Sequence, residues 1–383
     1  MPTVVISPYN VVNFPEGGGH FWVYLQYALG MRRVGCEVWW LEAFQPSGDE
    51  AADLARVELF RSKLERFGLG ERLIVYPTDG TPNAELPQRY VGRERADVEA
   101  IFAGADLLLS FHYAIAPALL ARFRRTALVD IDPGLLQFWI SRGQLSVPRH
   151  DLYFTTGDTV GRPGSRIPDC GIEWLRIRPP VSLESWPFSY QPEAEAFTTI
   201  SLWDSKDWIV DDDDSYENTK RSSFLEFAML PRLTRQPVEL ALYLKTEKDA
   251  QERSALERLG WRIRNSPEVA GTPEQYQAYI QGSRGEFSCA KRSCMKFQNA
   301  WISDRTLCYL ASGKPAVVQD TGPSSFLPDD GGLFRVSTAA QAAEAFAAIN
   351  EDYRKHCRKA RFIAERFFDS KQIALEILAH GLQ

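Results

Sequence analysis

A run of glycines followed by a histidine lies early in the chain, in the sequence Glu-Gly-Gly-Gly-His at positions 16–20. Glycine lets a ligand approach the backbone closely, and the free amides at the start of a helix attract anions. An imidazole beside such a loop can act as a general base near neutral pH, although a single histidine is more often structural. The candidate phosphate contacts are Gly17, Gly18 and Gly19, and the candidate base is His20.

Two adjacent cations, Lys220 and Arg221, stand at the expected start of a helix in the second half of the chain. Their charges would add to the partial positive charge of the helix dipole, which is a suitable environment for a diphosphate. The alternative is a solvated basic pair without a ligand, and this stretch alone favours neither interpretation.

A third group combines carboxylates with cations. Glu286 and Lys291 lie at the end of an expected strand. Further on, Ser303 is placed to cap a helix whose first turn holds Asp304 and Arg305. Carboxylates in such places can accept hydrogen bonds from ribose or sugar hydroxyls, and the cations can bind phosphate oxygens. The helix dipole alone would favour an acidic first turn, but it does not explain the cations gathered there.

Two aspartate-containing segments are weaker candidates. Asp132 follows an apolar run and should point into the crevice above a parallel sheet, which makes it a second candidate base. Residues 211–214 are four consecutive aspartates that could bind a divalent ion, but an acidic run without a preceding strand is usually a solvated loop. We therefore predict no metal site.

Short apolar runs alternate with helix-length segments along most of the chain, which predicts parallel strands joined by right-handed crossovers. The expected strands are 3–7, 37–41, 72–76, 107–111, 127–131, 152–156, 197–202, 238–244, 261–264, 285–289 and 315–319. Residues 161–192 are rich in proline and glycine, and their later part is expected to link two α/β halves. A basic amphipathic helix is expected over 351–380, with a break near Phe368.

Length and composition limit the functional classes. A chain of 383 residues favours two domains. The net charge of −6 lacks the basic footprint of nucleic-acid binding, so no nucleic-acid partner is predicted. No apolar run is long enough to span a membrane, no secretory signal is recognisable, and the six cysteines form no CxxC pair. A cytoplasmic protein with reduced thiols is expected.

The segments 32–38 (Arg-Arg-Val-Gly-Cys-Glu-Val) and 310–318 (Leu-Ala-Ser-Gly-Lys-Pro-Ala-Val-Val) resemble the GT-B glycosyltransferases. The first is similar to the turn into that family's second strand, and the second to the segment that ends its donor-binding helix. The resemblance implies two Rossmann-like doubly wound domains that face a cleft, with a C-terminal helix crossing back to the first domain. The implied parts are an acceptor domain over 1–185, a donor domain over 186–355 and the returning helix over 356–383.

The resemblance also implies roles for the candidate residues. Asp304 would accept hydrogen bonds from the nucleotide ribose, Lys220 and Arg221 would neutralise the diphosphate, and Glu286 would contact the transferred sugar. The glycine loop would lie against the diphosphate and the acceptor, with His20 near the base of inverting members. Glu286 and Asp304 are eighteen residues apart, whereas the family's two-glutamate motif has a spacing of eight, so the retaining mechanism associated with that motif does not follow.

The function predicted from these features is transfer of a hexosyl group from a nucleoside-diphosphate sugar, with UDP favoured, to an acceptor hydroxyl without a metal. Cations would stabilise the charge that develops on the leaving diphosphate. Two alternatives stay open: a nucleotide-sugar epimerase of the same fold, and a non-catalytic nucleotide-sugar-binding protein. A dehydrogenase is disfavoured because no GxGxxG motif follows the first strand.

Overall fold

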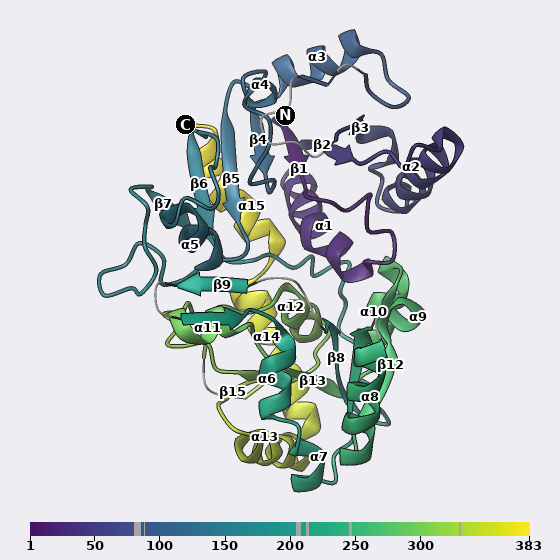
Figure 1. Cartoon of the computed structure of the whole chain (residues 1–383), viewed down its shortest axis with the longest axis vertical. Coiled ribbons are helices and arrows are strands. Elements are labelled where there is room, and N and C mark those ends of the chain that lie inside the picture. The colour runs from purple at the N-terminus through teal and green to yellow at the C-terminus, as the bar shows by residue number, and fades with distance from the viewer. Residues whose placement is uncertain (80–85, 88, 204–207, 212–213, 245–246, 329–330) are drawn as a thin grey trace. The chain divides into compact units, whose positions relative to one another are not determined.

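The computed structural model describes residues 1–79, 86–87, 89–203, 208–211, 214–244, 247–328 and 331–383 (Figure 1). The chain forms two compact units, each built on a parallel β-sheet with helices. Unit 1 consists of Met1–Ser182 and Ser370–Gln383, and unit 2 consists of Leu183–Asp369. The α/β class predicted from the alternation of apolar runs and helix-length segments is confirmed.

Unit 1 contains a seven-stranded parallel sheet with the order β3-β2-β1-β4-β5-β6-β7. Val4, Val5 and Ile6 of its central strand are fully buried, as expected for a strand covered on both faces. The strands are β1 (Thr3–Ser7), β2 (Glu37–Phe44), β3 (Leu73–Pro77), β4 (Leu107–Ser110), β5 (Thr126–Asp130), β6 (Leu152–Thr155) and β7 (Trp174–Arg176). The helices are α1 (Gly18–Arg33), α2 (Glu50–Glu65), α3 (Arg95–Gly104), α4 (Pro117–Leu120), α5 (Leu135–Ser141) and α15 (Ser370–Gly381), with a 3₁₀ turn over Gly70–Arg72.

Unit 2 contains a six-stranded parallel sheet with the order β12-β11-β8-β13-β14-β15 and a separate β9–β10 hairpin. Phe287 of β13 is buried against the rings of Phe227, Trp261 and Phe346. The strands are β8 (Phe197–Leu202), β9 (Trp208–Asp211), β10 (Asp214–Glu217), β11 (Val238–Tyr243), β12 (Arg262–Asn265), β13 (Gly285–Ser288), β14 (Ala316–Gln319) and β15 (Leu333–Val336). The helices are α6 (Lys220–Glu226), α7 (Leu230–Leu233), α8 (Glu247–Leu259), α9 (Ser266–Ala270), α10 (Pro273–Gln281), α11 (Arg292–Phe297), α12 (Asp304–Ala311), α13 (Ala339–Glu351) and α14 (Tyr353–Phe367).

Both sheets reverse their strand order at a central position. In unit 1 this switch point lies between β1 and β4, and in unit 2 it lies between β8 and β13. Connections from the two strands at a switch point diverge to opposite sides, which leaves a crevice at their carboxyl ends where ligands bind in doubly wound sheets. Each unit is therefore doubly wound, as predicted.

The C-terminal segment differs from the expectation that 356–383 is one helix packed on the first domain. A break at Phe368 and Asp369 divides it, near the position predicted. Helix α14 belongs to unit 2 and packs against α12, and only α15 packs in unit 1, against α1. Gly30 permits this second contact, because a Cβ there would lie 2.6 Å from the carbonyl oxygen of Ser370.

Several elements were not predicted. Strand β7 lies within the proline-rich stretch, and the β9–β10 hairpin separates β8 from the helix that follows. The helix expected to start at Lys220 and Arg221 is the short helix α6, followed by the single turn α7. These short elements have too few residues to establish a periodic pattern in the sequence.

Candidate functional site

A cationic cluster lies at the switch point of unit 2. Lys220 is the first residue of α6, which follows β8 and the hairpin, and Lys291 precedes α11 directly after β13. Arg305 lies in the first turn of α12. Burial, together with the positive charges of Arg305 and Lys291, lowers the pKa of Lys220 to about 7. These three residues, called the cationic cluster below, therefore form one electrostatic environment.

Two further contacts define the surroundings of Lys220. Its Nζ lies 5.2 Å from the centre of the Trp301 ring, within the range of a cation–π interaction. The side chain of Asn218 accepts a hydrogen bond from the amide of Ser293 at 2.9 Å, which ties the start of α6 to that of α11. The two lysines are thus held on neighbouring helices. An anion bound between them would stabilise the charged form of Lys220 and raise its pKa.

Arg305 has a structural role within this cluster. Its Nε donates to Glu286 at 2.8 Å, one Nη donates to the carbonyl of Ile200 at 2.8 Å, and the other donates to Ser288. Glu286 is fully buried and Arg305 is 7% exposed. The guanidinium therefore joins the carboxyl ends of β8 and β13. Glu286, which we expected to contact a transferred sugar, lies inside the unit as the partner of Arg305.

The basic pair predicted at the start of α6 is divided by the fold. The guanidinium of Arg221 is paired with Glu252, at Nε–Oε distances of 2.8 and 3.0 Å, and with Glu217 at 3.5 Å. Glu252 also accepts a hydrogen bond from Trp203. Two carboxylates compensate the charge of Arg221, so Lys220 belongs to the cationic cluster and Arg221 does not.

The start of α12 carries the predicted carboxylate. The helix begins at Asp304 with Ser303 as its N-cap residue, but the Ser303 side chain makes no capping hydrogen bond. Asp304 is partly exposed, whereas the rest of the helix is buried. A partly exposed carboxylate beside the cationic cluster can accept hydrogen bonds from vicinal hydroxyls.

In unit 1 the glycine run forms the start of α1. Gly17 is the N-cap residue, and a Cβ there would lie 2.3 Å from the Phe14 ring, so only glycine fits. Gly18 and Gly19 are the first helical residues, and no acidic side chain lies in this first turn. Their amides have no acceptor within the helix, as at the start of any α-helix.

The His20 imidazole is held in a defined tautomer. Its Nε2 lies 2.8 Å from the carbonyl oxygen of Tyr9. A carbonyl can only accept, so Nε2 carries the hydrogen and Nδ1 of the neutral ring keeps its lone pair. Burial lowers the pKa of His20, while the Tyr9 hydrogen bond and the negative charge of Asp132 act to raise it. His20 is therefore neutral near pH 7, and Nδ1 is its basic atom.

The second candidate base, Asp132, lies close enough to act on the charge of His20. Its loop is held by Asp130, which accepts hydrogen bonds from the Asp132 amide at 3.0 Å, from Gln137 at 2.7 Å and from Thr155 at 2.8 Å. Burial raises the pKa of Asp130 to about 6. Asp130 is fully buried and positions the loop, whereas Asp132 is partly exposed, so Asp132 stays the candidate base of the two.

Glu42 is a residue of this region that the sequence interpretation missed. It is fully buried in β2 and accepts hydrogen bonds from the amide of Val11 at 2.6 Å and from the indole of Trp40 at 2.8 Å. Burial raises the pKa of Glu42 to about 7. The carboxyl group fixes the loop that carries Tyr9. One acidic residue within the apolar run Val-Trp-Trp-Leu-Glu-Ala-Phe, residues 38–44, was the available signal.

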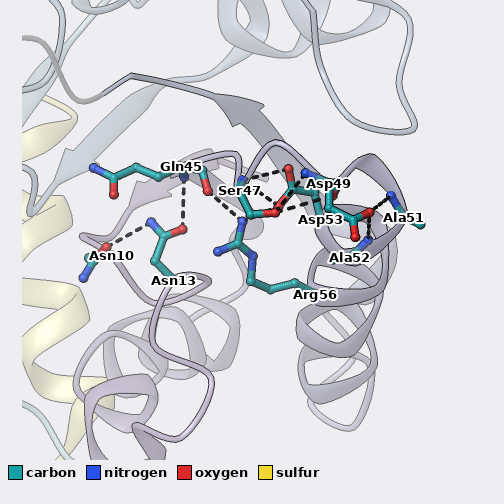
Figure 2. Close-up of polar contacts among 9 residues, drawn as sticks. All are labelled: Asn10, Asn13, Gln45, Ser47, Asp49, Ala51, Ala52, Asp53 and Arg56. Carbon is teal, nitrogen blue, oxygen red and sulfur yellow. Dashed lines mark hydrogen bonds and ion pairs between the residues drawn. The ribbon is translucent and has the colours of Figure 1, made fainter.

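The same loop is fastened by a polar network with the start of α2 (Figure 2). Asn13 donates to Asn10 and accepts from the amide of Gln45 at 3.0 Å, while Arg56 donates to the Gln45 carbonyl at 2.7 Å. Arg56 also pairs with Asp53 at 2.8 Å. The contacts from Glu42 and from this network immobilise the segment that orients His20.

His112, directly after β4, is a second missed residue. Its ring stacks on Tyr9 with a centroid distance of 5.1 Å. Burial lowers the pKa of His112 to about 4, so this imidazole is neutral at physiological pH. The switch point of unit 1 therefore carries aromatic and imidazole groups beside Asp132, in contrast to the cations of unit 2.

Neither a metal cluster nor a membrane helix is found in the part of the chain that the structure describes. No group of three or more His, Cys, Asp or Glu side chains gathers there in a metal-binding arrangement. Within the acidic run, Asp212 and Asp213 lie outside the described residues. None of the described helices has the length and apolar character needed to cross a bilayer.

Over its full length the chain is similar to solved glycosyltransferases. An alpha-glucosyltransferase in complex with UDP is 12% identical, with a TM-score of 0.60 and 100% of both chains covered. Anabaena HepE in complex with UDP is 14% identical, with a TM-score of 0.54 and 99% of both chains covered. A glycosyltransferase from Rickettsia africae is 10% identical, with a TM-score of 0.57 and 99% of this chain and 97% of that chain covered.

No protein-family model and no curated protein sequence matches the chain. The structural similarities confirm the GT-B fold that the two sequence segments suggested. Identities of 10–14% establish the fold and leave the chemistry to be argued from the residues themselves.

Proposed function

We propose that this chain is a glycosyltransferase that moves a hexosyl group from a nucleoside-diphosphate sugar, with UDP as the favoured nucleotide, to an acceptor hydroxyl. The observation that carries the proposal is the cationic cluster at the switch point of unit 2, where Lys220 shares its environment with Lys291 and Arg305. Two of the structural neighbours with this fold were solved with UDP, which supports the choice of nucleotide.

In the proposed donor site the lysines bind the diphosphate. When the bond from the anomeric carbon to the leaving oxygen breaks, negative charge develops on the β-phosphate, and fixed cations stabilise it. Lys220 and Lys291 would supply that charge, so the proposed reaction requires no metal ion. Asp304 would accept hydrogen bonds from the ribose hydroxyls, which is a role consistent with its partly exposed position.

In unit 1 the proposed base is His20. Its Nδ1 would take the proton of the acceptor hydroxyl as the acceptor oxygen bonds to the anomeric carbon and UDP leaves. Asp132 would stabilise the imidazolium that results, because its negative charge raises the pKa of His20. Asp132 as the base itself is the competing assignment. The amides of Gly18 and Gly19 are available to a phosphate or an acceptor.

The proposed acceptor is a small molecule or glycan with a free hydroxyl. Some neighbouring structures contain DNA beside UDP or UDP-glucose, and one structure of Anabaena HepE contains UDP and glucose. The net charge of −6 disfavours a nucleic-acid acceptor for this chain. Competition by a DNA oligonucleotide for sugar transfer would contradict this part of the proposal.

A thermal-shift experiment tests the donor assignment. UDP, dTDP, GDP and NAD are compared on the wild type, on Lys220→Met and on Lys355→Met, which removes an exposed lysine from α14. We expect UDP to raise the melting temperature of the wild type and of Lys355→Met by mass action, and to have little effect on Lys220→Met. Stabilisation by NAD and by none of the three diphosphates would overturn the proposal.

A turnover assay then separates transfer from the alternatives. UDP release from UDP-glucose should depend on an added acceptor and continue in the presence of EDTA. Release at the full rate without an acceptor would favour the epimerase or hydrolase alternative. Loss of activity with EDTA, restored by a divalent ion, would contradict metal independence.

A further inference from the structure

Unit 2 contains a pocket lined by arginine and aromatic side chains. It has a volume of about 280 Å³ and is lined by Phe188, Tyr190, Arg354, Arg358 and Arg361. We call it the arginine pocket. Arg361 donates to the carbonyl of Ala311, the last residue of α12, at 2.7 Å. Asp304 and the cationic cluster lie at the first turn of the same helix, which is about 12 Å long. The arginine pocket is therefore separate from the proposed donor site.

Helix α14 presents the three arginines on one face. Positions 354, 358 and 361 follow the i, i+4, i+7 spacing, so their side chains project in the same direction. Cys357, Ala360 and Ala364 are buried on the adjacent stripe of the helix. Burial of these small residues fixes the rotation of α14 about its axis, and with it the direction in which the three arginines project.

Of the three arginines, Arg361 has a structural role, and Arg354 and Arg358 are exposed to a ligand in solution. Arg361 binds the carbonyls of Trp186 and Ala311 and pairs with Glu365. Arg354 and Arg358 are exposed, and among the described residues neither forms an ion pair with a carboxylate. Helix α14 contains six Lys or Arg residues and one acidic residue. An anion bound beside Arg354 and Arg358 would relieve this uncompensated charge.

The aromatic side of the pocket is held in place. Gly313 has a φ of +70°, and a Cβ there would lie 2.3 Å from the Phe188 ring, so the ring packs directly on the backbone. Tyr190 stacks on Tyr353 with a centroid distance of 5.7 Å. The amide of Ser189, between the two rings, donates to the Ser312 carbonyl at 3.0 Å. Phe188 is nevertheless 43% exposed and Tyr190 is 38% exposed.

We propose that the arginine pocket binds a phosphate monoester whose ester group is aromatic or aliphatic. The guanidinium groups of Arg354 and Arg358 offer planar pairs of N–H donors that match phosphate oxygens. The exposed rings of Phe188 and Tyr190 offer apolar surface for the ester group. Such a group occurs on a free metabolite and on the headgroup of an acidic lipid, and the binding chemistry is the same in both cases. This inference does not depend on the proposed transferase activity.

Calorimetric titration with phenyl phosphate and inorganic phosphate tests the pocket. All proteins in this experiment also carry Lys220→Met, so that binding of phosphate at the cationic cluster contributes little to the measured heat. We expect phenyl phosphate to bind more tightly than inorganic phosphate. R354S/R358S should weaken phenyl phosphate binding about tenfold or more. The matched control K355S/R366S removes two exposed cations of α14 that do not line the pocket, and should change the affinity less than about twofold.

The outcomes are distinct. Equal losses in the two double variants would show general electrostatic attraction to α14 and overturn the proposal. Absence of phenyl phosphate binding to the parent protein would overturn it as well, unless vesicles bind through the same arginines. Sedimentation with phosphatidylcholine vesicles, with and without phosphatidic acid, identifies the source. Binding that requires phosphatidic acid and is lost in R354S/R358S assigns a lipid headgroup, and phenyl phosphate binding without vesicle binding assigns a free ester.

Discussion

The two units share a strand order but differ in what they place at the switch point. After the first strand, unit 1 continues through a loop into a helix that starts with glycines and His20, whereas unit 2 inserts a hairpin before a helix that starts with Lys220. After the fourth strand, unit 1 presents His112 and unit 2 presents Lys291. The same positions of one scaffold therefore carry imidazole groups in unit 1 and cationic groups in unit 2.

Under the proposed function, this difference would divide one reaction between two copies of the same architecture. In both units the carboxyl ends of the parallel strands lie at the same edge of the sheet. Residues placed after neighbouring strands at the switch point therefore lie close to one another. In unit 2 the buried Arg305–Glu286 pair lies beside the lysines and joins β8 to β13. In unit 1 the buried carboxyl groups of Glu42 and Asp130 hold the loops that carry Tyr9 and Asp132. Because both sheets have the same strand order around the switch point, charge type and loop support distinguish the two switch points.

The largest effect is expected in unit 1. His20→Ala should lower kcat by about a hundredfold to ten-thousandfold, because it removes the proposed general base. The same substitution should leave the affinity for UDP nearly unchanged. Steady-state kinetics and UDP titration measure the two quantities. His380→Ala, in α15 of the same unit, is the matched control. Asp132→Asn should lower kcat less than His20→Ala does. A larger loss of kcat in Asp132→Asn would indicate that Asp132 is the base. Equal losses of kcat and UDP affinity in His20→Ala would indicate a structural role.

The next largest effect is expected on the stability of unit 2. Arg305→Met leaves the buried Glu286 without its partner and should lower the free energy of unfolding by about 3–5 kcal/mol. Urea denaturation measures the change. The double variant R305M/E286L replaces the pair with apolar groups and should recover part of the loss. A change below about 1 kcal/mol in the single variant would show that the pair does not support the cluster.

A smaller effect separates the two adjacent cations of α6. Lys220→Met should raise the dissociation constant of UDP by about tenfold to a hundredfold, as expected for loss of a charge-assisted contact. Arg221→Met should change it less, because Glu252 and Glu217 already compensate that guanidinium. Isothermal titration of both variants measures the difference. Equal increases of the dissociation constant in the two variants would indicate that Arg221 also belongs to the donor site.

The smallest effect is proton uptake. With a pKa of about 7, Lys220 is largely neutral at pH 8 in the free protein. A diphosphate would raise this pKa, so UDP binding should take up as much as about one proton at pH 8, and UDP affinity should fall as the pH rises above 7. Titration in buffers of different ionisation enthalpy measures the uptake. Persistence of the uptake in Lys220→Met would assign it to another group.

Part of the site was predictable from sequence because it depends on local signals. Glycines before a helix, lysines after a strand and a carboxylate in a first helical turn are patterns within a few residues. They single out His20, Lys220, Lys291 and Asp304 as candidates, and the roles of these residues stay predictions. The ion pairs of Arg221 and Glu286 were not predictable in the same way, because the partner of each side chain lies far away in the sequence. Arg221 pairs with Glu252 at a separation of 31 residues, and Arg305 pairs with Glu286 at a separation of 19.

The amino-acid sequence by itself determined the α/β class, the doubly wound pattern and the kinds of residue at the strand ends, because the periodicity of apolar side chains is set by backbone geometry. Tertiary structure alone decided which cations are compensated, which imidazole nitrogen is basic, and that the two parts of the C-terminal segment belong to different units. Those outcomes depend on the strand order and on contacts between distant segments. A charge, a hydrogen bond or a helix packing face is defined only when both partners are in place.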